Sequence, residues 1–122
     1  MISAVITAGG KGLRMKSDIL KQYIKIKGIP ILSRAIKVFE SIEEIKEIIV
    51  VVPKGDADFC KNKILSYIDN KNSIKIAEGG VNRQDSVYNG LKTADNKNGI
   101  ILIHDGVRPF VSPNDIKRCI KP

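Results

Sequence analysis

Short runs of β-branched apolar residues alternate with longer amphipathic segments along this chain, and this alternation restricts its possible folds more than any other feature. The runs at residues 2–7, 47–52 and 99–104 are nearly all apolar, as expected for strands buried on both faces of a sheet. A further run at residues 73–77 alternates between apolar and polar residues, so it is predicted to lie nearer an edge.

A small strand at residues 24–26, followed by a Lys27-Gly28 turn, is predicted after the first strand, and helical segments are predicted between the longer strands. Pro30 is expected in the first turn of a helix that reaches about Ser41, and the segments 57–68 and 83–94 carry apolar stripes at helical spacing. Ser112 is expected to cap a last helix. Strands that alternate with helices of this length indicate βαβ units, so residues 1–122 are predicted to form part of one three-layer, Rossmann-like α/β domain with a mostly parallel sheet. Because so short a sheet usually continues, the chain is expected to be the N-terminal part of a longer protein.

The charge balance favours a phosphorylated partner. Formal net charge is +8, yet the lysines are scattered and the chain has only three Phe, three Tyr and no Trp. A nucleic-acid binder more often has a basic stripe with interleaved aromatic residues, so phosphorylated small molecules are predicted instead of nucleic acid. Cys60 and Cys119 fit no zinc spacing and are predicted to be buried free thiols. A signal peptide and a membrane span are both absent from the sequence, which predicts a cytoplasmic location.

The first candidate site follows the first strand, where residues 8–15 read Ala-Gly-Gly-Lys-Gly-Leu-Arg-Met. Glycines let backbone N–H groups crowd around an anion. The segment matches neither a Walker A loop nor the dinucleotide fingerprint. Arg14 and Lys21 can neutralise a triphosphate and the charge that develops during its transfer. The alternative is an ordinary β–α turn with solvated basic side chains.

Two further polar segments are expected at the same edge of the sheet, because ligands of open α/β sheets bind beyond the carboxyl ends of the strands. Residues 79–86 join a strand to a helix N-terminus, which suits a ribose, a base or a phosphate, although Ser86 and Asp85 are equally compatible with plain capping. Asp105 suits Mg²⁺, or else pairs with Arg108 to fix a turn. His104 is predicted to be a packed structural residue and not a catalytic base.

Four short sequence motifs resemble, in order and spacing, those of the methylerythritol-phosphate cytidylyltransferases of non-mevalonate isoprenoid biosynthesis. The motifs are residues 8–15, Lys21-Gln22-Tyr23, residues 79–87 and residues 104–109. The resemblance implies a transferase that moves CMP from CTP to a polyol phosphate, 2-C-methyl-D-erythritol 4-phosphate, and releases pyrophosphate, with Mg²⁺ as cofactor. Arg14 and Lys21 would be catalytic and Asp105 the metal ligand. The remaining residues implied to bind CTP are Ala8, Gly9, Gly10, Lys11, Gly12, Gly80, Arg83, Ser86, Gly106 and Arg108.

The resemblance covers about the first half of that family's length, with Leu20 where the family often has proline. Relatives carry a dimerising β-arm and the residues that grip the acceptor further along the chain, so a homodimer is implied only for a full-length protein. Ribitol 5-phosphate is the alternative acceptor. The alternative to an active enzyme is a fragment that binds CTP but does not catalyse the reaction.

Overall fold

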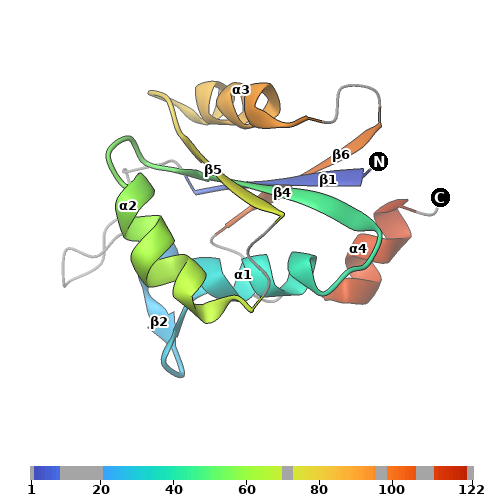
Figure 1. Cartoon of the computed structure of the whole chain (residues 1–122), viewed down its shortest axis with the longest axis horizontal. Helices are drawn as coiled ribbons and strands as arrows, with labels where there is room; N and C mark the ends of the chain where they lie inside the picture. The colour runs from blue at the N-terminus through green and yellow to red at the C-terminus, as the bar shows by residue number, and fades with distance from the viewer. Residues whose placement is uncertain (1, 9–20, 70–72, 96–98, 107–111, 121–122) are drawn as a thin grey trace.

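In the computed structural model of the protein, four parallel strands form one sheet with helices on both faces (Figure 1). The structure describes residues 2–8, 21–69, 73–95, 99–106 and 112–120, and of Lys21 only the backbone. The three-layer, mostly parallel α/β class predicted from the sequence is therefore confirmed.

The sheet has the strand order β5-β4-β1-β6, built from β1 (Ile2–Thr7), β4 (Ile45–Val52), β5 (Ile74–Glu78) and β6 (Ile100–Asp105). Buried apolar side chains fill both faces of the two central strands, β1 and β4, as their sequences predict. The alternating strand β5 lies at an edge, also as predicted. β6 forms the other edge, and its Ile100 and Ile103 are 46% and 45% exposed. The burial on both faces expected from its apolar sequence is therefore wrong, because this strand has a neighbour on one side only among the described residues.

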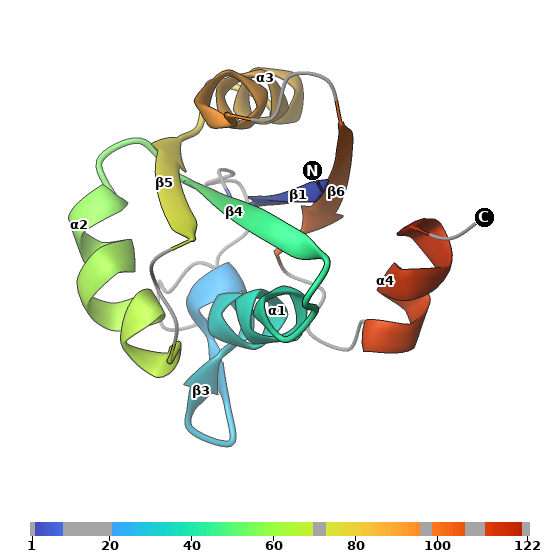
Figure 2. The ribbon, with the colours of Figure 1, turned by 45° about the vertical axis from the view of Figure 1, so that its right-hand side comes forward.

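The helices divide unequally between the two faces. Figure 2 shows α1 (Ile31–Glu40), α2 (Ala57–Phe59) and α4 (Pro113–Ile120) on one side of the sheet and α3 (Arg83–Thr93) alone on the other. After β5 the chain crosses back over the sheet and pairs with the far side of β1. Because βα crossovers keep one hand, a reversal of direction moves the connecting helix to the opposite face.

Each face of the sheet has its own apolar core. The larger cluster lies under α1, α2 and α4 and includes Leu32, Ile36 and Phe39 of α1 and Ile116 of α4. The smaller cluster lies under α3 and consists of Val5, Ile49, Val51 and Ala94, with Ala77, Leu91 and Ile101 packed against it.

A small antiparallel hairpin precedes α1. Its strands are β2 (Lys25–Ile26) and β3 (Ile29–Pro30), and the turn residues Lys27 and Gly28 have φ values of 52° and 82°. Two consecutive positive φ values are the signature of the type I′ turn that two-residue hairpins prefer. The predicted strand and turn are confirmed, whereas Pro30 precedes the first residue of α1 and does not lie in its first turn.

The helical segment predicted at 57–68 is present but irregular. After α2 it widens to a π-helical stretch, η2 (Cys60–Ile64), and then tightens to a 3-10 turn, η3 (Leu65–Tyr67). The Ser33 hydroxyl of α1 donates to the Ile64 carbonyl at 2.9 Å, which gives this carbonyl a partner outside the helix. Cys60, Ile64 and Ile68 are all buried, so the predicted apolar stripe is confirmed.

The last helix begins as predicted, because the Ser112 hydroxyl accepts a hydrogen bond from the Asp115 amide at 3.1 Å. The prediction for the cysteines was half wrong. Cys60 is buried, and burial raises the pKa of its thiol to about 12, but Cys119 of α4 is exposed. None of the described helices is both long enough and apolar enough to cross a membrane.

Candidate functional site

The carboxyl ends of β1 and β6 lie side by side at the place where the strand order reverses. Thr7 is paired with Asp105 in the parallel register, and the Gly106 amide donates to the Thr7 carbonyl at 2.9 Å. The Thr7 hydroxyl donates to the His104 carbonyl at 3.3 Å. In doubly wound α/β proteins the ligand crevice lies at this switch point, beyond the carboxyl ends of the strands. We call the ends of β1 and β6, residues 7–8 and 105–106, the rim.

The close packing of the rim explains why residue 106 is glycine. A Cβ atom placed on Gly106 would lie 2.8 Å from Leu32 Cδ1, 3.2 Å from the Thr7 carbonyl oxygen and 3.3 Å from Ala8 Cβ. The first of these distances is too short for two carbon atoms. Gly106 therefore lets the backbone at residue 106 lie directly against the end of β1 and Leu32 at the start of α1.

Ala8 is tied to two other parts of the chain. Its amide donates to the Val51 carbonyl at 2.6 Å, and its carbonyl accepts from Gln22 Nε2 at 2.9 Å. Gln22 is buried, so this bond holds the residues on either side of the undescribed segment 9–20 together. Sequence reasoning did not single out Gln22, because its partner is a main-chain carbonyl 14 residues away.

The backbone of Lys21 belongs to a short 3-10 turn, η1 (Lys21–Tyr23), whose other two residues are anchored. Gln22 binds Ala8, and the Tyr23 hydroxyl donates to Asp56 Oδ2 at 2.9 Å. The Tyr23 ring also lies 4.7 Å from the Phe59 ring, centroid to centroid. Burial, followed by the bond to Asp56, raises the pKa of Tyr23 far above its usual value. The turn that carries Lys21 is thus fixed to both Ala8 and the start of α2.

Residues 79–86 comprise the turn between β5 and α3 and the first turn of α3, and hydrogen bonds hold these two parts together. The Asn82 side chain accepts from the Asp85 amide at 2.9 Å and so caps α3. The Ser86 hydroxyl donates to the Asn82 carbonyl at 3.2 Å and accepts from the Gly80 amide at 3.3 Å. Asn82 is therefore the capping residue, and the buried Ser86 closes the turn from inside the first helical turn.

Gly80 also has a steric role in this turn, since a Cβ atom there would lie 2.2 Å from Asp85 Cβ. Arg83 is exposed and is the first residue of α3. Side chains alternate along a strand, so Thr7 and Asp105 share the face of Val5 and Ile101, which is the face covered by α3. Asp105, Gly80, Arg83 and Ser86 thus lie on the same side of the sheet.

Several predicted site residues lie outside the described part of the chain. They are Gly9, Gly10, Lys11, Gly12, Arg14 and Arg108. For Lys21 the described backbone lies next to Gln22, but its side chain is likewise outside the description. The structure thus brings Ala8 together with Asp105 and Gly106 at the rim, and puts Gly80, Arg83 and Ser86 in and beside one turn.

A magnesium ion at Asp105 would need most of its ligands from elsewhere. Among the described residues, no three His, Cys, Asp or Glu side chains are grouped closely enough to hold a metal ion. One carboxylate at a strand end is compatible with Mg²⁺, which commonly keeps several waters and binds through one or two carboxylates and substrate phosphates. The described donors therefore fit an ion that arrives with a phosphorylated substrate.

His104 faces the opposite side of β6 from Asp105. Its ring centroid lies 5.2 Å from that of Phe39 in α1, and it lines a hollow between β6 and α4 together with Leu102, Ile103 and Ile116. This packing agrees with the structural role predicted for His104.

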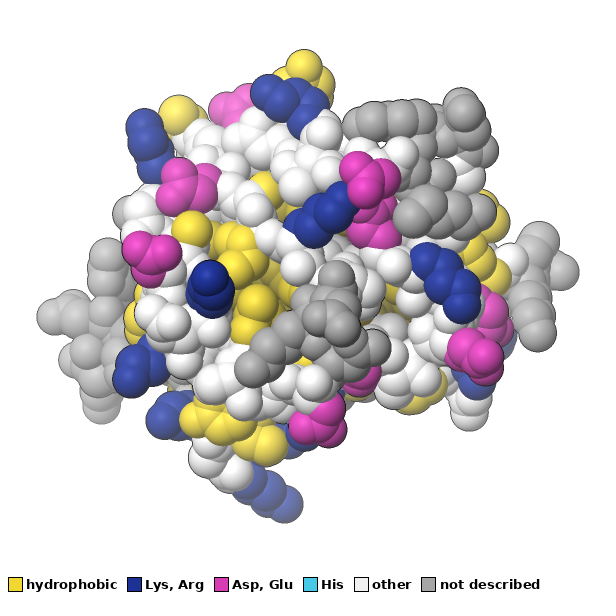
Figure 3. All heavy atoms as spheres, viewed as in Figure 1, with side chains coloured by type: hydrophobic (Ala, Val, Ile, Leu, Met, Phe, Trp, Pro, Cys, Tyr) yellow, Lys and Arg dark blue, Asp and Glu magenta, His cyan; other side chains and the backbone are white. Residues whose placement is uncertain are grey.

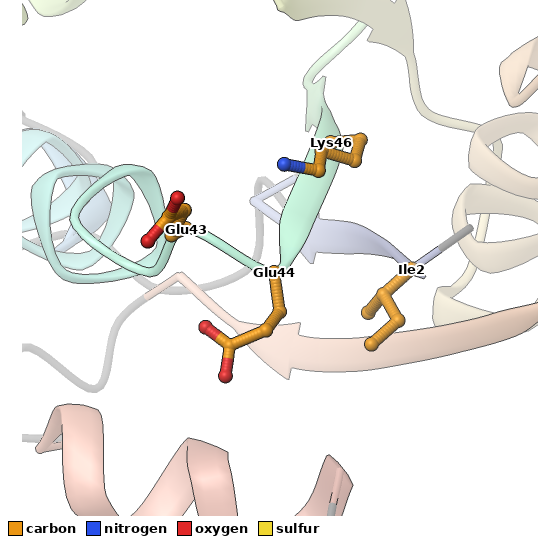
Figure 4. A pocket seen from close by; sticks show the side chains of 4 residues that line it. All are labelled: Ile2, Glu43, Glu44 and Lys46. Atoms are coloured by element: carbon orange, nitrogen blue, oxygen red, sulfur yellow. The ribbon is translucent and has the colours of Figure 1, made fainter.

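A second hollow lies at the other end of the sheet from the rim. Figure 4 shows it near the amino ends of β1 and β4, lined by Ile2, Glu43, Glu44 and Lys46. The amino ends of parallel strands are not where ligands of such sheets bind. On the face drawn in Figure 3, the described Lys and Arg side chains are scattered among Asp and Glu side chains and form no continuous stripe.

The amino half of the α3 face contains a buried carboxylate with three partners. Glu47 accepts from the Ser3 hydroxyl at 2.8 Å, from Lys75 Nζ at 2.7 Å and from the Asp95 amide at 2.9 Å. Burial alone would raise the pKa of Glu47, but the Asp95 amide, Lys75 and Ser3 outweigh it and lower the pKa from 4.5 to about 2. Lys75 also pairs with Asp95 at 2.7 Å, so this network fastens the end of α3 to the sheet.

The reversed strand order and the glycine-containing turns at the carboxyl ends define a doubly wound α/β protein of the Rossmann-like class. Comparison with known proteins narrows this class to a single family. The chain belongs to the 2-C-methyl-D-erythritol 4-phosphate cytidylyltransferase family, whose model matches residues 2–122.

Relatives with this family name include proteins from Alkaliphilus oremlandii, 45% identical over 118 residues, and Clostridioides difficile, 48% identical over 121 residues. The matches cover 97% and 99% of this chain but only 50% and 51% of the relatives. A solved structure of 4-diphosphocytidyl-2C-methyl-D-erythritol synthase from Anaerococcus prevotii has a TM-score of 0.80 at 38% identity, covering 98% of this chain and 48% of that one. The chain thus spans about half the length of the relatives it matches.

Proposed function

We propose that this chain is the CTP-binding part of a cytidylyltransferase that transfers CMP from CTP to 2-C-methyl-D-erythritol 4-phosphate and releases pyrophosphate. The observation that carries this proposal is the rim. There Asp105 and Gly106 lie beside Thr7 and Ala8, on strands whose order reverses between them. The names of the relatives supply the nucleotide and the acceptor.

The turn before α3 supports a nucleotide as the ligand. Its backbone is already shaped by Ser86 and Asn82, and the N-terminus of α3 presents N–H donors and partial positive charge. Ala8, Gly9, Gly10, Lys11 and Gly12 are proposed to surround the triphosphate. Gly80, Arg83 and Ser86 are proposed to form the cytidine side, with Gly106 and Arg108 shaping the rim.

The proposed reaction is an in-line displacement. An oxygen of the acceptor phosphate attacks the α-phosphorus of CTP, a new P–O bond forms, and the bond to the leaving pyrophosphate breaks. A phosphate monoester is already anionic near neutral pH, so the reaction requires no base to activate the nucleophile. Arg14 and Lys21 are proposed to neutralise the charge on the α-phosphate as it develops, so that catalysis consists of positioning and charge stabilisation.

Asp105 is proposed to hold Mg²⁺. A divalent ion bound there supplies positive charge to the substrate phosphates. Asp105 is suited to this role because it is the last residue of β6 and lies on the α3 face, the side of the sheet that carries Gly80 and Ser86.

The acceptor is proposed from the family. Both the family model and the relatives are named for 2-C-methyl-D-erythritol 4-phosphate, which favours it over ribitol 5-phosphate. We also propose a homodimer for the full-length enzyme, as the resemblance implies. A cytoplasmic location is proposed because Cys60 and Cys119 are free thiols, as is usual in a reducing compartment.

Titration calorimetry tests the proposal directly. The protein should bind CTP in the presence of Mg²⁺ in preference to ATP, and binding should weaken when Mg²⁺ is removed. Pyrophosphate release with each polyol phosphate then identifies the acceptor. Equal binding of both nucleotides, or binding of neither, would contradict the proposed site, and release with ribitol 5-phosphate alone would contradict the proposed acceptor.

Lys21→Ala, made in the full-length enzyme, separates catalysis from binding. Because the added charge belongs to the transition state, turnover should fall by roughly 10²-fold or more while CTP affinity falls less. Steady-state kinetics and calorimetry on the same samples measure the two effects. The matched control is Lys25→Ala, at an exposed lysine in β2, which should leave both unchanged. An unchanged kcat in Lys21→Ala would remove Lys21 from the mechanism.

A further inference from the structure

Gly90 occupies the middle of α3, where glycine is an unfavourable choice. Glycine in a helix interior costs about 0.5–1 kcal/mol relative to alanine, so its presence needs a structural cause. The cause is visible on its buried side. A Cβ atom on Gly90 would lie 2.7 Å from Val5 Cγ1 and 2.9 Å from Val51 Cγ2. Not even one methyl group fits between α3 and the sheet at this point.

This tight contact falls on the two central strands and close to the rim. Val5 belongs to β1, two residues before Thr7, and Val51 is the residue whose carbonyl accepts from the Ala8 amide. Both valines are fully buried and face α3. Gly90 therefore sets the height of α3 above the sheet at β1 and β4, close to the point where β1 ends at the rim.

The turn before α3 is bonded to the helix and must follow its position. Ser86, one helical turn before Gly90, holds the Gly80 amide, and the Asn89 side chain donates to the Glu78 carbonyl at 2.9 Å. The other end of the turn is fixed to the sheet, since the Gly79 amide donates to the Val52 carbonyl at 2.6 Å. A change in the height of α3 would thus be passed to Gly80 and Ser86, while residues 7–8 remain fixed in β1.

We propose that Gly90 is a positioning residue for the nucleotide site, and that it sets the distance between the Gly80–Ser86 turn and the rim. The inference rests on the proposed function, because it assumes that the turn and the rim hold one nucleotide. Non-bonded carbons normally lie about 3.5–4.0 Å apart, so a methyl group at residue 90 would displace α3 by on the order of 1 Å. A displacement of about 1 Å in a catalytic arrangement can lower the rate by about 10²-fold.

Gly90→Ala tests this inference with two measurements. In the ligand-free protein, NMR should show altered amide shifts at Ser86, one helical turn away, and also at Gly80, which lies outside the helix and ten residues from the substitution. With Mg²⁺ and CTP, affinity should fall and kcat/KM should drop by about 10²-fold, the loss that a displacement of about 1 Å can cause. Adding Val5→Ala, which removes the nearer contact, should restore a large part of both, and circular dichroism checks that each variant is folded.

Two single variants complete the design. Val5→Ala alone should lower stability through a cavity but leave CTP affinity unchanged, which separates lost packing from lost position. Lys92→Ala, on the exposed side of the same helix, should change neither the Gly80 shift nor affinity.

The three kinds of contrary result differ in meaning. Unaltered shifts at Gly80 and Ser86 would overturn the inference whatever the protein binds. Altered shifts with unchanged CTP affinity would overturn the positioning role and leave the proposed function standing. A parent protein that binds no CTP would overturn the proposed function itself, and the inference with it.

Discussion

The two faces of the sheet are covered in different ways. On the α1 face, large side chains such as Leu32, Ile36 and Phe39 fill a deep apolar layer between the helices and the strands. On the other face α3 approaches so closely that Gly90 leaves no room for a methyl group, and among the described residues the buried cluster there consists of Val5, Ile49, Val51 and Ala94. Figure 2 shows the two layers on either side of the strands.

This difference separates two tasks within one small domain. Buried apolar area is the main source of folding stability, and most of it lies on the α1 face. The α3 face contributes less apolar area, but polar contacts fix its helix at both ends, through Asn82 and Ser86 at one end and the Glu47 network at the other. We expect substitutions on the first face to affect stability most, and those on the second to affect ligand binding as well.

The largest loss of stability is expected from Ile36→Ala, at a fully buried residue of α1. Removing a buried Ile side chain to alanine costs about 2–5 kcal/mol of unfolding free energy. Leu91→Ala on α3 should cost clearly less, because Leu91 is only half-buried. Urea denaturation of the two variants measures the difference. An equal or greater loss in Leu91→Ala would contradict the division between the faces.

The second prediction concerns the pH dependence of stability that arises from the Glu47 network on the α3 face of the sheet. The pKa of Glu47 is lowered from 4.5 to about 2, so the charged form stabilises the fold above the unfolded pKa, and this contribution is lost as pH falls toward the folded pKa. Between about pH 5 and pH 2, stability should drop by on the order of 3 kcal/mol from this group.

Glu47→Gln should remove most of that dependence and be less stable than the parent at pH 7, because Lys75 loses one of its two charged partners. Denaturation midpoints measured at several pH values test both points. The matched control is Glu44→Gln, at a carboxylate of the hollow at the amino end of the sheet, which should keep the parent slope. A parent-like slope in Glu47→Gln would show that other carboxylates are responsible.

The smallest expected effect comes from a matched pair of helix caps. Asn82 caps α3 and Ser112 caps α4, and replacing either by alanine should cost about 1 kcal/mol of stability. Only Asn82→Ala should also weaken CTP binding, since only α3 carries the turn of the proposed site. Thermal unfolding and calorimetry compare the two variants. Equal effects on binding would argue that the turn before α3 does not contact the nucleotide.

Much of the fold was predictable because its signals are local. The apolar run of β1, the Lys27-Gly28 turn and the Ser112 cap each depend on neighbouring residues only, and all three were confirmed. The location of the rim followed from strand polarity, which places the ends of parallel strands at one edge.

The features that escaped prediction depend on contacts distant in sequence. The π-helical stretch contains a carbonyl bonded to Ser33 of another helix, and Gln22 binds a main-chain carbonyl of Ala8. Neither partner leaves a pattern near the residue in question. The exposure of Cys119 was also missed, because a helical apolar pattern does not reveal which face a terminal helix buries. In the candidate site, the sequence showed which charged, polar and glycine residues could bind a phosphorylated ligand, whereas it did not show the hydrogen bonds that position them.

The most direct test of a nucleotide site at the rim is hydrogen–deuterium exchange with and without CTP and Mg²⁺. Exchange should slow in peptides that cover residues 5–8, 79–86 and 103–106, and should stay unchanged at residues 43–46, which include Glu43, Glu44 and Lys46 of the hollow at the opposite end of the sheet. If exchange slows around that hollow while the other three segments are unaffected, the nucleotide binds at the opposite end of the sheet and the account is wrong.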